Sequence, residues 1–191
     1  MKTMFLDTST NLLYISFVFD NKVVYEVKSE GSNNHSDYLL KYIEEGLDKL
    51  SIQVKDFDQF VIGIGPGAYT GLRVSLAVAK MFAWTLNLPL YTISSLDLLT
   101  SGIKQDGKYA VCFKAKKDYS YFKTLDIKNG KVNRSEEVFL CNDEINQKID
   151  FNVYNKVTHD EINIDVLNIS KDELTKVENI HALEPNYLRA C

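Results

Sequence analysis

A glycine-rich segment followed by an almost wholly apolar helix is the feature that most constrains the fold of this chain. The segment runs from Gly63 to Gly71 as Gly-Ile-Gly-Pro-Gly-Ala-Tyr-Thr-Gly, and the predicted helix continues to Leu86. A helix that is apolar nearly all round is buried on more than one side. We therefore expect one side to pack on a sheet of this chain and the other to bind a partner protein. Few polar residues interrupt the helix, namely Arg73, Ser75, Lys80 and Thr85.

Composition places the chain among ordinary globular proteins. Its 191 residues are 45% hydrophobic and 25% charged, which permits a real core. The net charge is -4 and no basic face stands out, which argues against tight binding of a phosphate backbone by this chain alone. No apolar run approaches the length of a membrane span or a signal peptide.

Cysteine usage favours a reducing compartment. The three cysteines, Cys112, Cys141 and Cys191, are odd in number and far apart, and no Cys-x-x-Cys pair occurs. This pattern predicts no disulfide framework. We therefore expect a cytoplasmic protein.

The order of predicted elements indicates an α/β fold. Alternating β-forming residues predict strands over 2–6, 12–19 and 22–27, with a hairpin turn at Asp20-Asn21. Helical spacing predicts a helix over 35–50, and a continuous apolar run predicts a strand over 58–64 that is buried on both faces. The apolar helix, a strand over 89–93 and a short helix over 96–101 follow. The order β-β-β-α-β-α-β-α predicts a mixed sheet of five strands.

The chain changes character near residues 101–108, so we divide it into residues 1–103 and 104–191. The second part has predicted strands over 109–115 and 119–127, a hairpin turn at Asn129-Gly130 and a strand near Val132. A weak helix over 143–149, a strand over 151–154 and a helix over 171–179 complete the prediction.

Two groups of residues admit both a phosphate-binding and a structural interpretation. The end of the first strand carries Asp7, Thr8 and Ser9. These residues suit a magnesium-bound water and a phosphate, or the hydrogen bonds of a turn, and from the residues alone we favour the turn. The glycine-rich segment has no Lys-[Ser/Thr] and no complete G-x-G-x-x-G pattern. Gly65 and Gly67 either expose backbone N–H groups to an anion or let the strand and the helix pack closely.

Small residues recur every four positions on the apolar helix, at Ser75, Ala79 and Ala83. They allow a close approach either to the sheet of this chain or to a helix of another subunit, and we favour the second. The histidines have no metal-ligand spacing with one another or with the cysteines. The sequence offers no carboxylate pair and no nucleophile with a base, so we predict no catalytic and no metal-binding residue.

Several stretches resemble one protein family. The chain is similar to the TsaB (YeaZ-type) proteins almost without a break from residue 3 to about 100, and the closing Glu184-Pro-Asn-Tyr-Leu-Arg189 matches the family's Pro-x-Tyr-Leu-Arg. The Gly-Pro-Gly run is the most specific match. The matching stretches are Phe5-Leu-Asp-Thr-Ser-Thr10, His35-Ser-Asp-Tyr-Leu-Leu40, Val61-Ile-Gly-Ile-Gly-Pro-Gly-Ala-Tyr-Thr-Gly-Leu-Arg73, Ala79-Lys80, Leu88-Pro89 and Ser94-Ser-Leu96.

The resemblance implies an actin-like (ribonuclease H-like, ASKHA) fold with two related α/β lobes. It implies a role in the bacterial machinery that forms N6-threonylcarbamoyladenosine at position 37 of tRNAs reading ANN codons. TsaD is the catalytic paralogue, TsaC supplies the threonylcarbamoyl adenylate and TsaE is an ATPase. TsaB is a non-catalytic accessory subunit that binds TsaD through two helices of its first lobe, forms a homodimer in isolation and meets tRNA only within the complex.

The resemblance and the residue pattern together define the expected sites. No cofactor is expected to be bound tightly, although ATP or ADP would fit the interface shared with partners. A remnant phosphate or nucleotide site comprises Asp7, Thr8, Ser9, Gly65 and Gly67. The partner interface is expected to comprise His35, Leu39, Ile43, Leu47, Arg73, Ser75, Val78, Ala79, Phe82 and Ala83.

The second lobe departs from the family. Members carry Asp-Ala-Arg-[Arg/Lys]-x-[Glu/Gln]-[Val/Ile]-Tyr near its start, where this chain has Lys114-Ala-Lys-Lys-Asp-Tyr-Ser-Tyr121. We therefore expect residues 104–191 to form a reduced lobe whose last segment returns to the first. The alternative function is a stand-alone actin-like small-molecule kinase or ATPase. A metallopeptidase is disfavoured by the absence of a metal-ligand cluster in the sequence.

Overall fold

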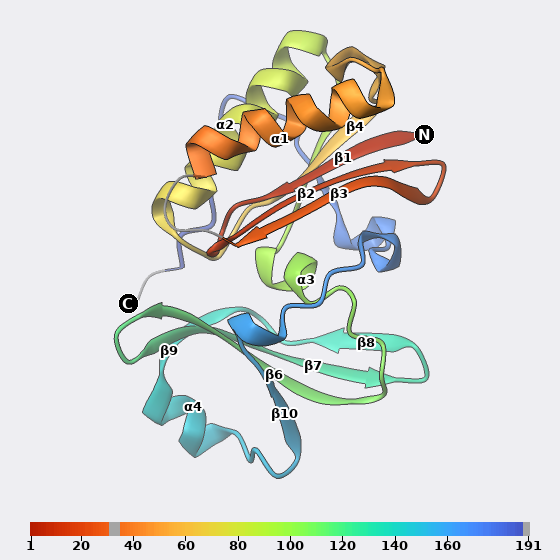
Figure 1. Cartoon of the computed structure of the whole chain (residues 1–191). Helices are drawn as coiled ribbons and strands as arrows, with labels where there is room; N and C mark the ends of the chain where they lie inside the picture. The colour runs from red at the N-terminus through yellow and green to blue at the C-terminus, as the bar shows by residue number, and fades with distance from the viewer. Residues whose placement is uncertain (31–34, 189–191) are drawn as a thin grey trace.

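The computed structural model describes residues 1–30 and 35–188, and two β-sheets lie one above the other in Figure 1. The elements of the first half are β1 (Lys2–Asp7), β2 (Leu12–Phe19), β3 (Lys22–Glu30), α1 (His35–Leu50), η1 (Val54–Asp56), β4 (Gln59–Gly63), α2 (Tyr69–Leu86), β5 (Leu90–Ile93) and α3 (Ser95–Leu99). Those of the second half are β6 (Gly107–Lys116), β7 (Tyr119–Lys128), β8 (Lys131–Arg134), β9 (Val138–Cys141), α4 (Asn142–Lys148), β10 (Tyr154–Val157), η2 (His159–Glu161), η3 (Val166–Asn168), η4 (Lys171–Glu173) and β11 (Thr175–Lys176).

The first sheet has the strand order β11-β5-β4-β1-β2-β3. Strands β1, β4 and β5 are parallel to one another, while β2 and β3 form an antiparallel hairpin. Its turn residues Asp20 and Asn21 adopt φ angles of 46° and 62°, as a tight hairpin turn requires. The expected sheet of five strands is corrected to six, because β11 pairs with the free edge of β5. The helix predicted over 171–179 is wrong, since this stretch holds η4 and β11.

The second sheet has the order β10-β6-β7-β8, and β9 pairs with another part of β7. Its centre is the long β6–β7 hairpin, and β10 joins β6 in parallel. The turn at Asn129-Gly130 has φ angles of 53° and 74°, which confirms the predicted hairpin. The sequence did not indicate β9, which is a short strand of four residues.

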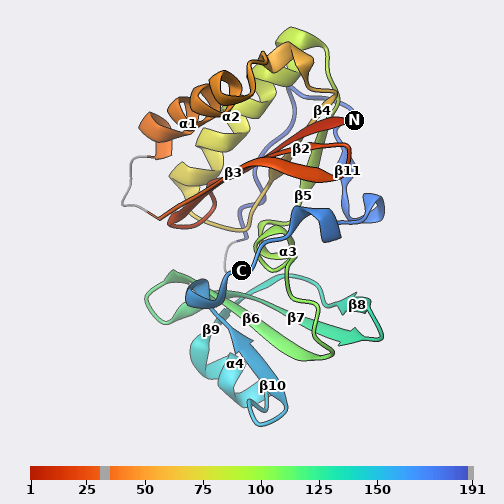
Figure 2. The same cartoon turned by 45° about the vertical axis from the view of Figure 1, so that its right-hand side comes forward.

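The first sheet is buried on both faces. Helices α1 and α2 cover one face, as Figures 1 and 2 show, and their apolar core includes Met4 and Phe60. Phe5 and Val61 point to the opposite face and share a second core with Val111 of the second sheet. This explains why β4 is apolar without alternation. The two sheets are therefore joined through a common apolar core that also contains α3.

The small residues of α2 lie on its inner side. Ser75, Ala79 and Ala83 are completely buried, and so is Leu39 of α1, while Ile43 is 2% exposed. This side of α2 packs on β1, β4 and β5. Small side chains let the helix approach the sheet closely. The expected place of these five residues in the partner interface is therefore corrected, because they are buried inside the chain. Whether the helix pair binds a partner stays a prediction.

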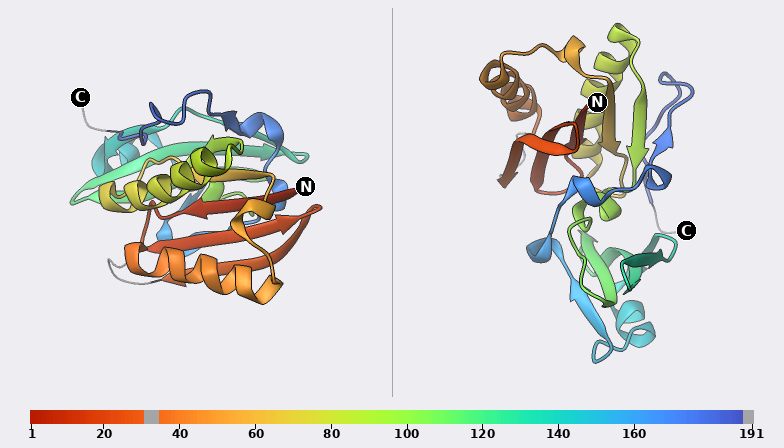
Figure 3. Two further views of the ribbon diagram at one scale, coloured as in Figure 1. Left: turned by 90° about the horizontal axis from the view of Figure 1, so that it is seen from above. Right: turned by 90° about the vertical axis from the view of Figure 1, so that its right-hand side faces the viewer.

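The chain's own last segment covers another side of α2. Figure 3, seen from above, shows the dark blue segment running beside α2 on the side away from α1. The Lys80 ammonium donates to the carbonyl oxygens of His181 and Leu183, both at 3.0 Å. Val177 and Ile180 pack against the same core as the inner side of α2. The polar Lys80 is thus explained by a contact within the chain.

Replacing Ala79 by arginine should unfold the protein, because a guanidinium would be buried without a partner. We expect a loss of at least about 4 kcal/mol in the free energy of unfolding. Ala77→Arg is the matched control, because Ala77 lies on the exposed side of the same helix. Urea denaturation followed by circular dichroism measures both variants. Equal stability of the two would contradict the placement of Ala79.

Candidate functional site

A buried carboxylate holds the end of β1 in place. Asp7 is completely buried and accepts hydrogen bonds from the Ser9 backbone N–H at 2.8 Å and from the Ser9 hydroxyl at 2.6 Å. Its other oxygen accepts a hydrogen bond from the Ser95 hydroxyl at 2.6 Å. The Ser95 Oγ in turn accepts from the Gly65 N–H at 2.9 Å. Asp7 therefore joins β1, the turn after it, the glycine-rich segment and α3.

The glycines permit this close packing. A Cβ at Gly63 would lie 1.7 Å from Asp7 Oδ2, and one at Gly71 would lie 1.9 Å from the Thr8 carbonyl oxygen. A Cβ at Gly67 would lie 2.4 Å from the Ser9 carbonyl oxygen. These contacts account for the motif by backbone packing, the second of the two interpretations given above. Gly65 additionally has a φ of +108°, which side-chain-bearing residues rarely adopt.

Two members of the expected phosphate site are occupied by the chain itself. The Thr8 hydroxyl donates to the Gly71 carbonyl oxygen at 2.6 Å and accepts from the Ser75 N–H at 3.3 Å. Thr8 and Asp7 are both completely buried. They are corrected from ligand-binding to structural residues because neither reaches the surface. Gly65 is also buried, whereas Ser9 and Gly67 line a cavity described below.

Burial raises the pKa of the Asp7 carboxyl, although hydrogen bonds from Ser9 and Ser95 oppose the shift. The folded state then holds a proton that the unfolded state releases above about pH 4, so stability falls as pH rises towards the folded pKa. Asp7→Asn removes this titration. We compare the free energy of unfolding of the wild type with that of Asp7→Asn. The wild-type value minus the variant value should fall by up to about 1.4 kcal/mol for each pH unit. Urea denaturation between pH 4 and 7 tests this, and parallel pH profiles would contradict it.

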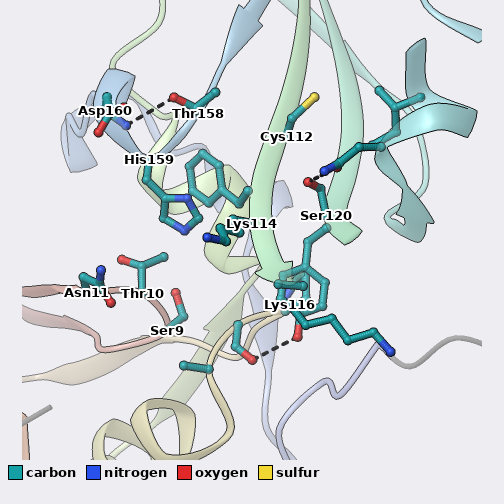
Figure 4. Close-up of a pocket in the computed structure, with 18 of the residues that line it drawn as sticks. Ser9, Thr10, Asn11, Cys112, Lys114, Lys116, Ser120, Thr158, His159 and Asp160 are labelled. Atoms are coloured by element: carbon teal, nitrogen blue, oxygen red, sulfur yellow. Dashed lines mark hydrogen bonds between the residues drawn. The ribbon is translucent and has the colours of Figure 1, made fainter. Parts of the chain in front are cut away.

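A cavity of about 830 Å³ lies between the two halves of the chain and is called the cleft here. The first half contributes the turn after β1 and the glycine-rich segment before α2, and the second contributes β6, β7, α4, the end of β10 and the residues after it (Figure 4). The residues that matter most for its chemistry are Ser9, Thr10, Gly67, Lys114, Lys156, Thr158 and His159.

Topology explains why these residues meet. The parallel strands β1 and β4 end at Asp7 and Gly63, directly before the turns that line the cleft. The parallel pair β6 and β10 ends at Lys116 and Val157, directly beside it. Ligands of α/β proteins bind outside the carboxyl ends of their strands. Both sheets thus direct these ends to one cavity.

Aromatic contacts shape the wall of the cleft. The His159 ring stacks on Phe113 with centroids 4.6 Å apart, and its burial lowers the pKa of the imidazole. The Tyr121 hydroxyl donates to the Gly67 carbonyl oxygen at 3.2 Å. This hydrogen bond joins the second sheet to the glycine-rich segment across the cavity.

A second candidate site is the outer face of the two helices. Leu40 of α1 and Met81 of α2 are 47% and 49% exposed, and Trp84 of α2 is 63% exposed. Ala77, Met81 and Trp84 follow one another at spacings of four and three, so they share one side of α2. We call these four residues the helix face. The sequence analysis placed none of the four in the partner interface, although the three on α2 lie opposite the small-residue stripe that it chose.

The remaining expected interface residues occupy the flanks of the helices. His35 Nε2 lies 2.8 Å from the Thr10 carbonyl oxygen. The exposed Arg73 guanidinium donates to the Tyr187 hydroxyl at 2.9 Å and stacks on Tyr69, so it is held by the last segment. Three residues are partly buried beside the inner core, namely Leu47, Val78 and Phe82.

Some features bear on other functions. Among residues 1–30 and 35–188 no group of three His, Cys, Asp or Glu side chains is placed to hold a metal ion. Cys112 and Cys141 are free thiols, whereas Cys191 and Arg189 lie outside the described residues. None of the helices in the described part of the chain has the length and apolar character needed to cross a membrane.

Comparison with known proteins decides the family. A sequence model described as TsaD, tRNA N6-adenosine threonylcarbamoyltransferase, matches residues 26–166. The chain belongs to this family. It is 30% identical to the TsaB protein of Bacillus subtilis over 131 residues, which cover 68% of this chain and 57% of that protein. It is 37% identical to TsaB of Buchnera aphidicola subsp. Baizongia pistaciae over 103 residues, covering 53% of this chain and 46% of that protein.

The resemblance to TsaB (YeaZ-type) proteins is therefore confirmed, and the chain spans about half the length of these curated relatives. A crystal structure described as an uncharacterized protein with similarity to peptidase YeaZ from Pseudomonas aeruginosa superposes with a TM-score of 0.78 at 18% identity. The superposition covers 98% of this chain and 99% of that one. It confirms the actin-like α/β fold class, with two mixed sheets and the sixth strand noted above.

Proposed function

We propose that this TsaB-type chain is a non-catalytic accessory subunit of the machinery that forms N6-threonylcarbamoyladenosine in tRNA. It binds a TsaD-type threonylcarbamoyltransferase through the helix face. The relatives named as tRNA threonylcarbamoyladenosine biosynthesis proteins support the pathway. The observation that carries the binding role is the exposure of Leu40, Met81 and Trp84 on two neighbouring helices. Large apolar side chains gathered on one face are typical of protein interfaces.

The partners follow from the same proposal. In isolation, the helix face pairs two copies of the chain, and TsaD replaces the second copy. TsaE acts on the resulting complex, tRNA is met only there, and ATP or ADP would be bound where the subunits meet. The site of action is the cytoplasm.

Local chemistry favours this role over a stand-alone kinase or ATPase. Asp7, the carboxylate at the end of β1, is enclosed by Ser9 and Ser95 and does not reach the cleft. It is therefore unavailable to position a nucleotide-bound magnesium ion. Calorimetry with Mg-ATP, together with a hydrolysis assay, separates the two functions, because turnover by the chain alone would favour the enzyme.

Met81→Arg combined with Leu40→Arg should disrupt the complex. Each guanidinium would lose its water against an apolar partner surface, and we expect a loss of at least about 3 kcal/mol, or roughly 150-fold in affinity. Co-elution with the cognate TsaD protein in size-exclusion chromatography, followed by titration calorimetry, measures the effect. The fold should survive because both residues are exposed in the single chain.

Val153→Arg is the matched control, because Val153 is 54% exposed but lies beside the second sheet. It should bind TsaD as the wild type does. A wild-type chain that never co-elutes with TsaD would overturn the proposal. An arginine pair that binds as tightly as Val153→Arg would show that another surface is used.

A further inference from the structure

A second cavity lies between the end of α3, the β7–β8 hairpin and the segment before β11, and we call it the hairpin cavity. In Figure 2 the blue segment that precedes β11 passes above β8. The hairpin cavity has a volume of about 430 Å³, which is within the usual range for small-molecule sites. It has no lining residue in common with the cleft, so it is a separate site.

Part of the lining of the hairpin cavity is apolar. Leu125 and Ile127 of β7 line it, and both belong to the core that the two sheets share. Ile103 and Val132 also line it and pack against the same core. The cavity therefore offers a hydrocarbon surface that continues the interior of the protein, and an apolar ligand body would lose its contact with water there.

A network of enclosed ion pairs reaches the hairpin cavity. The Lys123 ammonium of β7 lies 2.7 Å from Asp97 Oδ1 and 3.4 Å from Glu137 Oε1. Arg134 of β8 pairs with Asp97 at 3.1 Å through Nε and with Glu173 of η4 through Nη2. The five side chains are between 4% and 27% exposed. Arg134 and Glu173 are the two members of this network that line the cavity.

The network carries one more negative than positive charge. Two cations face three carboxylates, and in the described part of the chain no further Lys or Arg forms an ion pair with Asp97, Glu137 or Glu173. Lys104, the third charged residue of the lining, is paired with Asp165 at 3.3 Å and does not compensate the excess. A charge without a counter-ion is costly where water is largely excluded. The network therefore favours the binding of a cation.

The lining also has hydrogen-bond acceptors that are not fully used. The Glu173 carboxylate accepts from Arg134 and, at 2.7 Å, from the Ser170 N–H, which leaves about two of its four acceptor positions. The Asn168 amide donates to the Ser101 carbonyl oxygen at 2.9 Å. Its own carbonyl oxygen accepts no hydrogen bond from residues 1–30 or 35–188. An ammonium group has three N–H donors and suits such a set.

We propose that the hairpin cavity binds a small primary amine with an apolar body. The ammonium group pairs with Glu173 and donates to the Asn168 carbonyl oxygen, while the apolar body covers Ile103 and Val132. The positive charge of the ligand balances the excess negative charge of the ion-pair network, whereas a carboxylate ligand would increase that excess. This inference goes beyond the accessory role, because the cavity is separate from the helix face and from the cleft.

Titration calorimetry of the whole chain at pH 7 and low ionic strength tests the proposal with three probes of equal chain length, hexylamine, hexan-1-ol and hexanoate. Hexylamine is protonated at this pH, because the pKa of an alkylammonium group is about 10. We expect hexylamine to bind at or below millimolar concentration and hexan-1-ol at least fivefold more weakly. Hexanoate should bind more weakly still. Binding of hexan-1-ol or hexanoate as tight as that of hexylamine, or no binding of hexylamine at 10 mM, would overturn the proposal.

Variants locate the site. Glu173→Gln keeps the shape of the side chain and removes the excess charge, so it should weaken hexylamine binding at least tenfold and hexan-1-ol binding less than twofold. The control is Glu136→Gln, an exposed carboxylate of the same half that does not line the cavity, and it should change neither affinity more than twofold. Equal weakening of both probes by Glu173→Gln, or of hexylamine by both variants, would overturn the assignment.

A second variant tests the place of the site without changing a charge. Val132 is partly exposed and lines the cavity, so Val132→Phe should fill the space while the fold is kept. We expect a loss of at least tenfold in hexylamine affinity. Thermal melting verifies that each variant is folded, and Val132→Phe alone decides the location if Glu173→Gln unfolds. Hexylamine binding that Val132→Phe leaves unchanged would place the amine elsewhere and overturn the proposal.

Discussion

The arrangement of the chain depends on one enclosed carboxylate. Asp7 is contacted by the turn after β1, by α3 and by the glycine-rich segment, so a single side chain fixes the relative positions of four segments. Its charged form loses hydration on burial, and the hydrogen bonds from Ser9 and Ser95 offset part of that cost. Gly63 shows how close this packing is, since even a methyl group there would meet the carboxylate. The glycines of this segment allow the backbone to pack closely around the carboxylate and the turn after β1.

The second constraint is the burial of the first sheet on both faces. One face meets α1 and α2, and the other shares a core with the second sheet through Phe5, Val61 and Val111. The Tyr121 hydrogen bond to Gly67 adds a polar link across the cleft. Continuous apolar contact of this kind holds the two halves in one arrangement. The cleft is therefore a preformed cavity, whereas the helix face lies on the opposite side of the first sheet.

Much of the fold followed from local pattern, whereas the sites did not. Alternation and turn residues predicted β2 to the residue, and the double-sided burial of β4 followed from its unbroken apolar run. The stripe of Ala79 and Ala83 was assigned to the wrong side because small residues suit a sheet as well as a partner helix. Strand β11 has two residues and exists only because β5 offers an edge, so no local signal could reveal it. The cleft depends on strand ends that only tertiary structure brings together.

The last segment has a consequence for the order of folding during synthesis. Strand β11 completes the edge of the first sheet. The residues after it contact α2, where Lys80 donates a hydrogen bond to the His181 carbonyl oxygen and the Trp84 ring packs against the His181 ring. On the ribosome, β5 and α2 emerge long before these residues are made. The N-terminal unit therefore keeps an open sheet edge and an uncovered helix flank until residues 175–183 have been synthesised. A translation product that stops before these residues would expose the unpaired edge of β5 and the apolar flank of α2. Chaperones and proteases recognise such surfaces, so the truncated chain would be removed.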